Sequence, residues 1–291
     1  MPDARTHIDE GLRFQKLGML DRALKQYEAT LDSTIDPALT GEALCRQAHV
    51  YRAWCRWDEA VRLARRSAAI ARASRMHPLE AEALNAEAIV LLEQARFDEA
   101  VVIFERILSL EIDDRMRGIV YQNLGSIAAQ RADFDRAEQY YQSSYRSFSR
   151  AGYLWGEAFT LTNIAAASID AGKVKPAEII AGQAIRAAKK VGDLELVGIA
   201  SLNAAEALAA QLQLERAQEL VSEALGYFQM EENDLRRAQC LRVLGDVRML
   251  QGQREEARKL YGEALRLADS VRNDFEVSRL QDCLELATAV E

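Results

Sequence analysis

The sequence predicts an all-α fold built from repeated helix pairs, and three observations support that prediction. A short string ending in alanine recurs seven times along the 291 residues. A second small residue precedes each of these alanines by twelve positions. Only 4 prolines and 7% aromatic residues are present, which is sparse for a chain with many turns and a single large core. A modular array of helices fits this composition better.

The recurring string is a mostly apolar residue, two mostly charged residues and alanine. Its alanines are Ala23, Ala60, Ala100, Ala137, Ala177, Ala217 and Ala257. They are 37, 40, 37, 40, 40 and 40 residues apart, so one unit spans about 39 residues. Seven occurrences at nearly constant spacing predict seven structural repeats.

Each repeat is predicted to consist of helix A, a tight turn and helix B. The small residues twelve positions before the alanines are Gly11, Ala48, Ala88, Gly125, Ala165, Ala205 and Gly245. Small residues at a fixed offset indicate two helices in close contact. A left-handed turn residue is expected five positions before each alanine, at Gly18, Cys55, Ala95, Ala132, Gly172, Leu212 and Gly252.

The prolines agree with this division into helices. Pro2, Pro37, Pro78 and Pro176 all fall where a helix is predicted to start. Proline is tolerated there because the N–H that it lacks would have no partner within the helix. No proline interrupts the interior of a predicted helix.

The pattern resembles the tetratricopeptide repeat (TPR), whose unit has a small residue at position 8, alanine at position 20 and an aromatic or apolar residue at position 24. Position 24 is filled by Tyr27, Phe104, Tyr141, Val221 and Tyr261, and the departures are Ala64 and Ala181. The usual TPR period is 34 residues. The longer unit found here resembles the subgroup in kinesin light chains, peptide-responsive Rap-type regulators and the sensory arm of MalT-like transcription activators.

This resemblance implies a right-handed α-solenoid of seven TPR helix pairs plus a C-terminal capping helix. One continuous solenoid over residues 1–291 is expected. Its repeats are predicted at 4–37, 41–77, 81–114, 118–152, 158–192, 198–233 and 238–271. Residues 274–290 are predicted to form the capping helix, because the last repeat of such an array needs its apolar face covered.

In TPR proteins the inner faces of the A helices line a groove that holds peptides or a partner helix, mainly through positions 2, 5, 6, 9, 12 and 13. Asn123, Asn163 and Asn203 occupy position 6 of repeats 4, 5 and 6, and Asn85 occupies position 5 of repeat 3. A carboxamide can pair with an extended backbone whatever its side chains, since it offers an acceptor and two donors. The alternative interpretation is that each Asn bonds the neighbouring helix.

Other polar residues at groove positions are expected to tune the preference for partner side chains. They are Gln122, Ser126, Gln130, Thr162, Asp170, Glu206, Arg242 and Asp246. Glu206 and Asp246 lie forty residues apart on adjacent predicted A helices. This pair is expected to select a cationic side chain rather than to perform acid/base chemistry.

The sequence contains no recognisable catalytic motif. His7, His49 and His77 are isolated, so no histidine pair at helical spacing can hold a metal. There is no Walker loop, dinucleotide fingerprint or nucleophile elbow. We therefore expect no enzyme activity, no metal site and no cofactor.

The net charge, the length of the apolar runs and the cysteines limit which partners and which cellular compartment are expected. The net charge is −8; residues 1–76 carry +3 and residues 77–291 carry −11. Because residues 77–291 are acidic and repel phosphate groups, nucleic acid is not expected to be the main partner. No membrane span is expected, because no run approaches the roughly 18 apolar residues required. The absence of a secretory signal and four unpaired cysteines, expected to be free and buried, favour a cytoplasmic location.

A basic helix stands out in repeat 2, with no acidic residue between Ala60 and Leu79. Its arginines are Arg56, Arg62, Arg65, Arg66, Arg72 and Arg75. The segment is a predicted helix B and should face away from the groove. The favoured interpretation is a solvated face, and the alternative is docking to an acidic partner, a membrane surface or RNA.

These observations together favour a noncatalytic adaptor or scaffold that binds a peptide or protein segment in the concave groove. One alternative is a signal-responsive regulator whose array binds a peptide or small ligand and controls a partner. Another is a self-assembling structural subunit, so homo-oligomerisation stays open. The identity of the partner is not encoded in the spacing of the repeats.

Overall fold

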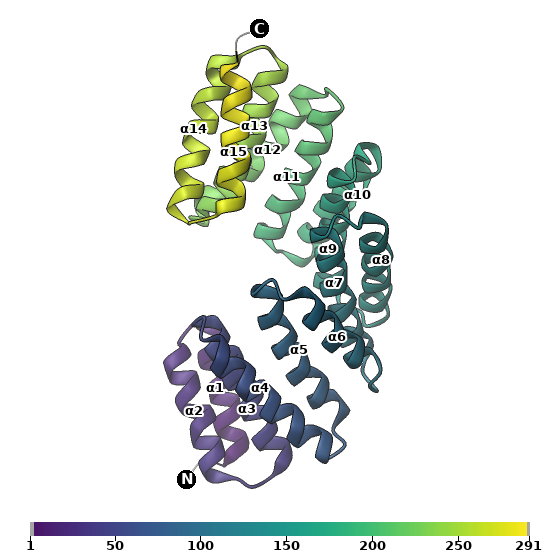
Figure 1. Cartoon of the computed structure of the whole chain (residues 1–291), viewed down its shortest axis with the longest axis vertical. Helices are drawn as coiled ribbons and strands as arrows, with labels where there is room; N and C mark the ends of the chain where they lie inside the picture. The colour runs from purple at the N-terminus through teal and green to yellow at the C-terminus, as the bar shows by residue number, and fades with distance from the viewer. Residues whose placement is uncertain (1–2, 290–291) are drawn as a thin grey trace. The chain divides into compact units, whose positions relative to one another are not determined.

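A computed structural model describes residues 3–289, which contain fifteen α-helices and no β-strand (Figure 1). The prediction of seven helix pairs and a cap is confirmed for this part of the chain. The A helices are α1 (Ala4–Lys16), α3 (Pro37–Ala53), α5 (His77–Glu93), α7 (Asp114–Gln130), α9 (Leu154–Asp170), α11 (Leu194–Ala210) and α13 (Asp234–Leu250). The B helices are α2 (Leu20–Ser33), α4 (Trp57–Ala73), α6 (Phe97–Leu108), α8 (Phe134–Arg150), α10 (Val174–Val191), α12 (Leu214–Met230) and α14 (Arg254–Ser270).

The observed helix starts refine the predicted repeat boundaries. From repeat 2 onward each A helix begins four residues before the predicted boundary, as at His77 against residue 81. Pro37 and Pro78 lie in the first turn of α3 and α5, and Pro176 is the third residue of α10. The predicted cap is α15 (Asp274–Thr288). Pro2 and residue 290 lie outside the described residues.

The chain divides into two compact units, residues 1–127 and residues 128–291. In unit 1 each A helix packs on its B helix, α2 and α4 pack on the next A helix, and α3 contacts both α1 and α5. Unit 2 repeats this pattern from α8 to α15, with contacts of α11 to α9 and α13. Consecutive helix pairs therefore stack within each unit, as a repeat array requires.

The marker residues of the repeat form the core of each pair. All seven string alanines are at most 1% exposed. The position 24 residues are buried as well, including Ala64 and Ala181. Gly11 and Gly245 are required by close approach, because a Cβ at either position would overlap the ring of Tyr27 or Tyr261. Smallness at position 8 thus makes room for the aromatic residue at position 24.

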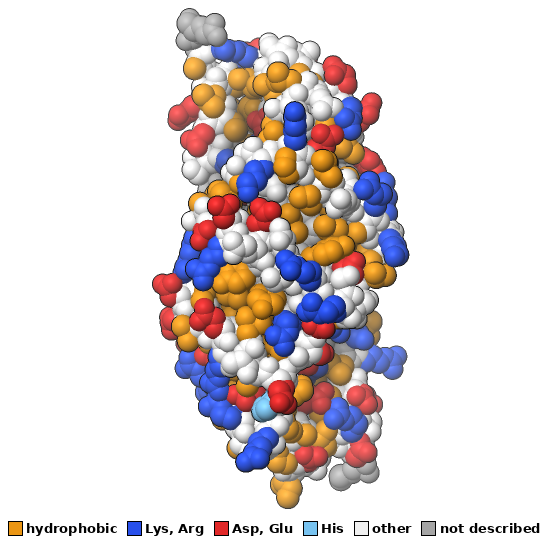
Figure 2. All heavy atoms as spheres, turned by 90° about the vertical axis from the view of Figure 1, so that its right-hand side faces the viewer, with side chains coloured by type: hydrophobic (Ala, Val, Ile, Leu, Met, Phe, Trp, Pro, Cys, Tyr) orange, Lys and Arg blue, Asp and Glu red, His pale blue; other side chains and the backbone are white. Residues whose placement is uncertain are grey.

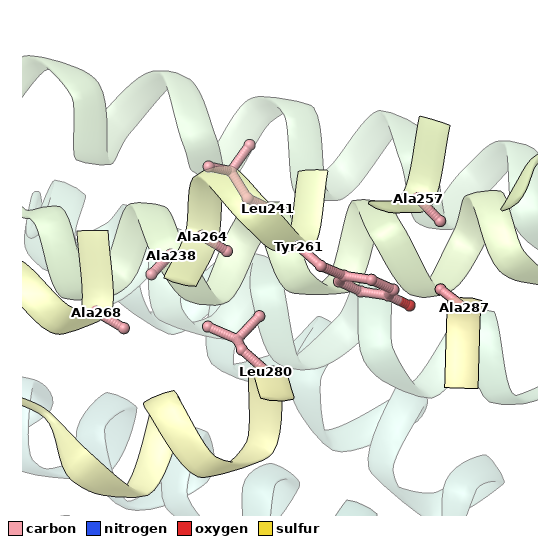
Figure 3. Packing of buried hydrophobic residues seen from close by; sticks show 8 residues of the cluster. All are labelled: Ala238, Leu241, Ala257, Tyr261, Ala264, Ala268, Leu280 and Ala287. Atoms are coloured by element: carbon pink, nitrogen blue, oxygen red, sulfur yellow. The ribbon is translucent and has the colours of Figure 1, made fainter. Parts of the chain in front are cut away.

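Helix α15 covers the last helix pair. Leu280 and Ala287 of α15 pack with Ala257 and Tyr261 of α14 in one buried cluster (Figure 3). Leu280 is fully buried. The capping role predicted for this segment is consistent with that packing.

The tight turns inside the repeats adopt the predicted left-handed conformation. Glycine fills the position in three repeats, and the other four, Cys55, Ala95, Ala132 and Leu212, have φ between 56° and 60°. These four non-glycine residues are strained, since a left-handed residue with a Cβ costs roughly 1–2 kcal/mol. Cys55 is exposed in its turn and Cys283 is half-buried, so the expectation of four buried thiols is wrong for these two.

Among the residues described, no helix has both the length and the apolar character that crossing a membrane requires.

Candidate functional site

The A helices present a regular set of positions to the surface, and burial separates these positions into classes. Position 5 is buried in every repeat, from Ile8 to Arg242. This burial differs from the expectation that position 5 lines the groove; Arg242, for example, bonds Glu206 of the preceding A helix. Position 9 is half-buried in every repeat, at Leu12, His49, Ile89, Ser126, Ala166, Glu206 and Asp246. Position 13, at the C-terminal end of the A helices, is exposed in every repeat, so positions 9 and 13 both form surface rows.

The three asparagines at position 6 differ in their surroundings. Asn203 is 7% exposed, and its Nδ2 donates a hydrogen bond to the Thr162 carbonyl oxygen at 3.0 Å. Asn203 thus follows the alternative interpretation, a bond to the neighbouring A helix. Asn123 and Asn163 are half-buried, and their carboxamides have no hydrogen-bond partner among the described residues. These two remain able to pair with a ligand.

The remaining polar candidates of repeats 4 and 5 also divide by burial. Gln122 and Thr162 sit at position 5 and are 5% and 2% exposed. The Thr162 hydroxyl donates to the Ala158 carbonyl oxygen within α9. Ser126 is half-buried and donates to the Gln122 carbonyl oxygen, whereas Gln130 and Asp170 are exposed. Gln122 and Thr162 therefore support the helices rather than offering a surface to a partner.

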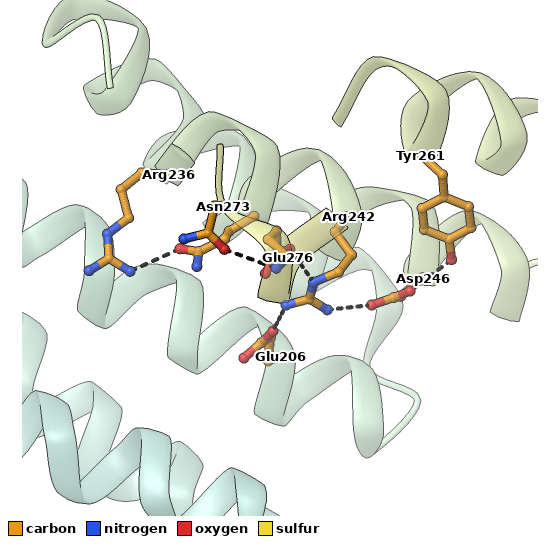
Figure 4. Close-up of polar contacts among 8 residues, drawn as sticks. Glu206, Arg236, Arg242, Asp246, Tyr261, Asn273 and Glu276 are labelled. Carbon is orange, nitrogen blue, oxygen red and sulfur yellow. Dashed lines mark hydrogen bonds and ion pairs between the residues drawn. The ribbon is translucent and has the colours of Figure 1, made fainter. Parts of the chain in front are cut away.

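Glu206, Arg242 and Asp246 are brought together in unit 2, but they bind one another (Figure 4). Arg242 is 4% exposed. Its guanidinium donates to Glu206 of α11, to Asp246 Oδ2 at 3.1 Å and to Glu276 Oε1 of α15 at 3.0 Å. The cation expected to come from a partner is supplied by the chain itself. We call these four residues the Arg242 cluster.

The Arg242 cluster carries more negative than positive charge. Three carboxylates surround one guanidinium, and the second oxygen of Glu276, Oε2, is buried without a hydrogen-bond partner in the described part of the chain. Burial raises the pKa of Asp246, although Arg242 and the hydroxyl of Tyr261 oppose the shift. Desolvation, followed by the Glu206 carboxylate, raises the pKa of Asp170. The cluster joins α11, α13 and α15 and is primarily a structural element.

Unit 1 has an open pocket on the same set of A-helix positions. The α3–α5–α7 pocket has a volume of about 360 Å³, within the range of small-ligand sites. It is lined by Arg46, His49, Pro78, Glu82, Asn85, Ile112, Asp113, Arg115, Met116 and Ile119. The lining mixes apolar and polar side chains, so the pocket suits an amphipathic group such as one residue of a polypeptide.

Two polar atoms in the lining of this pocket lack partners. Asn85 Oδ1 and Arg46 Nε are buried and form no hydrogen bond within the described residues. The Arg46 Nη2 atom lies 3.8 Å from Glu82 Oε2, which is a loose ion pair. An unpaired buried polar atom destabilises the fold by about 1–3 kcal/mol. A bound peptide unit, which has one donor and one acceptor, could pair with the polar groups of Asn85 and Arg46 that face the pocket.

The imidazole of His49, another residue in the lining of this pocket, is held neutral. Burial, and then the positive charges of Arg46 and Arg52, lower its pKa to about 4. Its Nε2 atom lies 3.9 Å from the Cys45 sulfur. Burial raises the pKa of that thiol to about 12, so Cys45 is not a reactive thiolate near neutral pH. The pocket therefore offers hydrogen-bonding groups and apolar contact rather than a reactive thiolate.

Sequence reasoning found Asn85 but missed most of this pocket. Arg46, His49 and Glu82 occupy groove positions 6, 9 and 2, which could have marked them. The segment before α7 gave no such signal, because Asp113 lies outside the repeat positions and caps α7 by accepting from the Met116 N–H at 2.7 Å. Within the part of the chain that is described, no three His, Cys, Asp or Glu side chains are placed to hold a metal ion.

Comparison with known proteins agrees with the repeat geometry. Residues 39–111, which contain α3 to α6, match the tetratricopeptide repeat family. This match covers two of the seven helix pairs in the described part of the chain. A comparison with curated protein sequences finds no match.

Solved structures of low identity share the TPR solenoid fold. The apo form of RapI is 14% identical, with 92% of this chain and 98% of RapI covered and a TM-score of 0.72. The apo quorum sensor NprR from B. thuringiensis is 15% identical, with 91% and 76% covered and a TM-score of 0.71. BtubC from P. vanneervenii is 18% identical, with 79% and 93% covered and a TM-score of 0.60. At these identities the similarity establishes the fold alone.

Proposed function

We propose that this TPR protein is a noncatalytic adaptor that binds an extended polypeptide segment on the A-helix surface, with the α3–α5–α7 pocket holding one residue of that segment. The observation that carries the proposal is an open pocket of about 360 Å³ whose lining combines the Asn85 carboxamide and the Arg46 guanidinium with apolar side chains. A peptide unit presents the matching donor and acceptor.

Further polar groups on the same class of position support this assignment. In unit 1 the half-buried Asn123 has a free carboxamide, and in unit 2 Asn163 does. Ser126, Gln130, Asp170 and the outer edges of Glu206 and Asp246 would then adjust which side chains are accepted. Asn203, Gln122, Thr162 and Arg242 act through the helices and are removed from the proposed contact set.

The test is selection of a library of random short peptides on the purified chain, followed by binding measurements on variants. Met116→Arg places a long charged side chain in the pocket and is expected to abolish binding of the selected peptides. The matched control is Ile179→Arg, which adds the same charge at a 65% exposed position of α10. Retained binding by Met116→Arg, with a normal circular dichroism spectrum, would contradict the proposal.

A regulatory version of this function has a specific observation in its favour. NprR is a quorum sensor, and a Rap protein of 16% identity was solved in complex with competence and sporulation factor. In that version the bound segment is a signal that changes how the array engages an output protein. Small-angle scattering with and without a selected peptide distinguishes the two, because an adaptor keeps its scattering profile and a switch changes it.

Compartment, nucleic acid and self-association belong to the proposal as well. We place the adaptor in the cytoplasm, with a protein or peptide partner and no nucleic acid. A constant mass by light scattering over a range of concentrations is expected for a monomeric adaptor. A mass that rises with concentration would favour the self-assembling subunit instead.

A further inference from the structure

A second groove lies in unit 1 on the B-helix side, away from the A-helix positions described above. It has a volume of about 390 Å³ and runs between α4 and α6 over α5. Its floor is aliphatic, formed by Ala68 and Ala69 of α4, Leu84 of α5, and Val102 and Ile103 of α6. Val102 is 66% exposed, so the floor is open to a partner. We call this the α4–α6 groove.

Three arginines form the rim of this groove. Arg65 and Arg72 come from α4 and Arg106 comes from α6. Their side chains are 61%, 54% and 40% exposed. Hydrophobic side chains bordered by Lys and Arg are also visible on the face of the molecule shown in Figure 2.

Two buried carboxylates of α5 hold these arginines in place. Arg65 Nε donates to Glu87 Oε1 at 2.7 Å, and Arg72 Nε donates to Glu80 Oε1 at 3.0 Å. Arg106 Nη2 donates to the same Glu80 oxygen at 2.6 Å. The Glu80 and Glu87 side chains are only 3% and 7% exposed.

This anchoring orders the rim before any partner arrives. The Nη groups of Arg65 and Arg72 have no partner among the residues described, so they remain able to donate. Positioned donors lower the conformational entropy lost on binding. Arginine is well suited to this role because its planar fork pairs with carboxylates in two-point geometry.

The positive charge of the arginines at and near the groove favours a partner that carries negative charge. Arg62, Arg66 and Arg75 lie exposed on or just after α4 and have no ion pair in the described structure. At the groove itself the three rim arginines outnumber the two buried carboxylates that hold them, Glu80 and Glu87. An apolar floor between basic rims is complementary to a segment with apolar side chains flanked by Asp or Glu.

From these contacts we infer that the α4–α6 groove docks an acidic amphipathic segment of a partner protein. Apolar side chains of the segment cover Val102 and the alanines of α4, and its carboxylates pair with the rim arginines. A single-stranded nucleic acid is disfavoured because the floor has no aromatic side chain on which bases could stack.

The test uses a fluorescein-labelled helical peptide with Leu on one face and Glu on the other, and twins in which Gln or Lys replaces Glu. Fluorescence anisotropy should show saturable binding of the Leu/Glu peptide that weakens with added salt. The Gln and Lys twins should bind at least tenfold more weakly. Equal binding of the Gln twin, or tighter binding of single-stranded RNA or phosphatidylserine vesicles, would overturn the inference.

Variants locate the binding on the groove. Val102→Asp changes an exposed residue of the floor and should weaken the Leu/Glu peptide roughly tenfold or more through repulsion and lost apolar contact. Ile179→Asp, the same kind of change at a 65% exposed position of α10, should leave binding unchanged. Unaltered binding by Val102→Asp would overturn the inference. Met116→Arg distinguishes binding in the α4–α6 groove from binding in the α3–α5–α7 pocket, because this variant should bind the Leu/Glu peptide normally.

Discussion

Asn85 in unit 1 and Arg242 in unit 2 occupy the same position of their repeats, and the structure uses them differently. Both are buried, at 9% and 4% exposure. Arg242 is bonded to carboxylates on its own and two neighbouring A helices, so its charge stabilises unit 2. Asn85 has an acceptor atom without a partner beside an open pocket. The comparison shows that the same repeat position can be fully paired within the chain or keep an unpaired polar atom, depending on what the neighbouring helices place opposite it.

The largest expected effect comes from removing the cation of the Arg242 cluster. Arg242→Met leaves Glu206, Asp246 and Glu276 facing one another, and should lower the free energy of unfolding by about 3–5 kcal/mol. The counterpart in unit 1, Asn85→Leu, removes an unpaired acceptor and should change stability by less than about 1 kcal/mol. Urea denaturation followed by circular dichroism measures both. Similar losses of stability for the two variants would show that Asn85 and Arg242 stabilise their units equally.

Acid should act on the two regions with opposite sign. The pKa of His49 falls from 6.5 to about 4 in the folded state. Its contribution to stability is therefore complete above about pH 6.5 and is lost as the pH falls toward 4, by roughly 1–3 kcal/mol. The pKa of Asp246 is raised in the folded state above its unfolded value of 3.8. The contribution of Asp246 to folding stability is therefore complete below pH 3.8 and is lost as the pH rises through its folded pKa.

Tryptophan fluorescence can follow the His49 effect within unit 1. A Trp155→Phe background leaves Trp54 and Trp57 as the tryptophans of the chain, and both belong to unit 1. The urea concentration at the denaturation midpoint should decrease as the pH is lowered from 6.5 to 4. The His49→Gln variant should show a weaker dependence of this midpoint on pH. A His49→Gln chain with the original pH dependence would show that another group is responsible.

A smaller effect is expected at the asparagines of position 6 in unit 2. Asn203→Ala loses the bond to the Thr162 carbonyl oxygen and should cost about 1–2 kcal/mol. Asn163→Ala should change the melting temperature little but weaken binding of the selected peptides. Loss of thermal stability with intact peptide binding would identify Asn163 as structural, like Asn203.

The smallest effect concerns the strained turns, one in each unit. Ala95→Gly and Leu212→Gly relieve φ values of 56° and 60°, and each should raise the free energy of unfolding by up to about 1 kcal/mol. Gly172→Ala is the reverse control and should lower it, since Gly172 has φ of 71°. Differential scanning calorimetry measures these shifts. A stabilising Gly172→Ala would mean that left-handed strain does not govern these turns.

The repeat itself was predictable because its signals are local and recur. A small residue at Gly245, alanine at Ala257 and an aromatic residue at Tyr261 must coincide for two helices to pack, and the structure places them in contact as expected. The left-handed turns were predictable for the same reason, even where leucine or cysteine replaces glycine. From repeat 2 onward the predicted repeat boundaries lie four residues after the observed starts of the A helices, because the first turn of each A helix, such as the one that Asp36 caps before Pro37, lies outside the repeat markers.

The sequence by itself thus determined the fold class, the pairing of helices and the set of A-helix positions from which a site could be built. Only the tertiary structure decided which of those positions are accessible and which polar groups are already paired. Arg242 illustrates the reason, since its partners Glu206 and Glu276 lie 36 and 34 residues away on other helices. Helical periodicity fixes the direction of a side chain on its own helix, whereas pairing depends on which side chain the neighbouring helix presents.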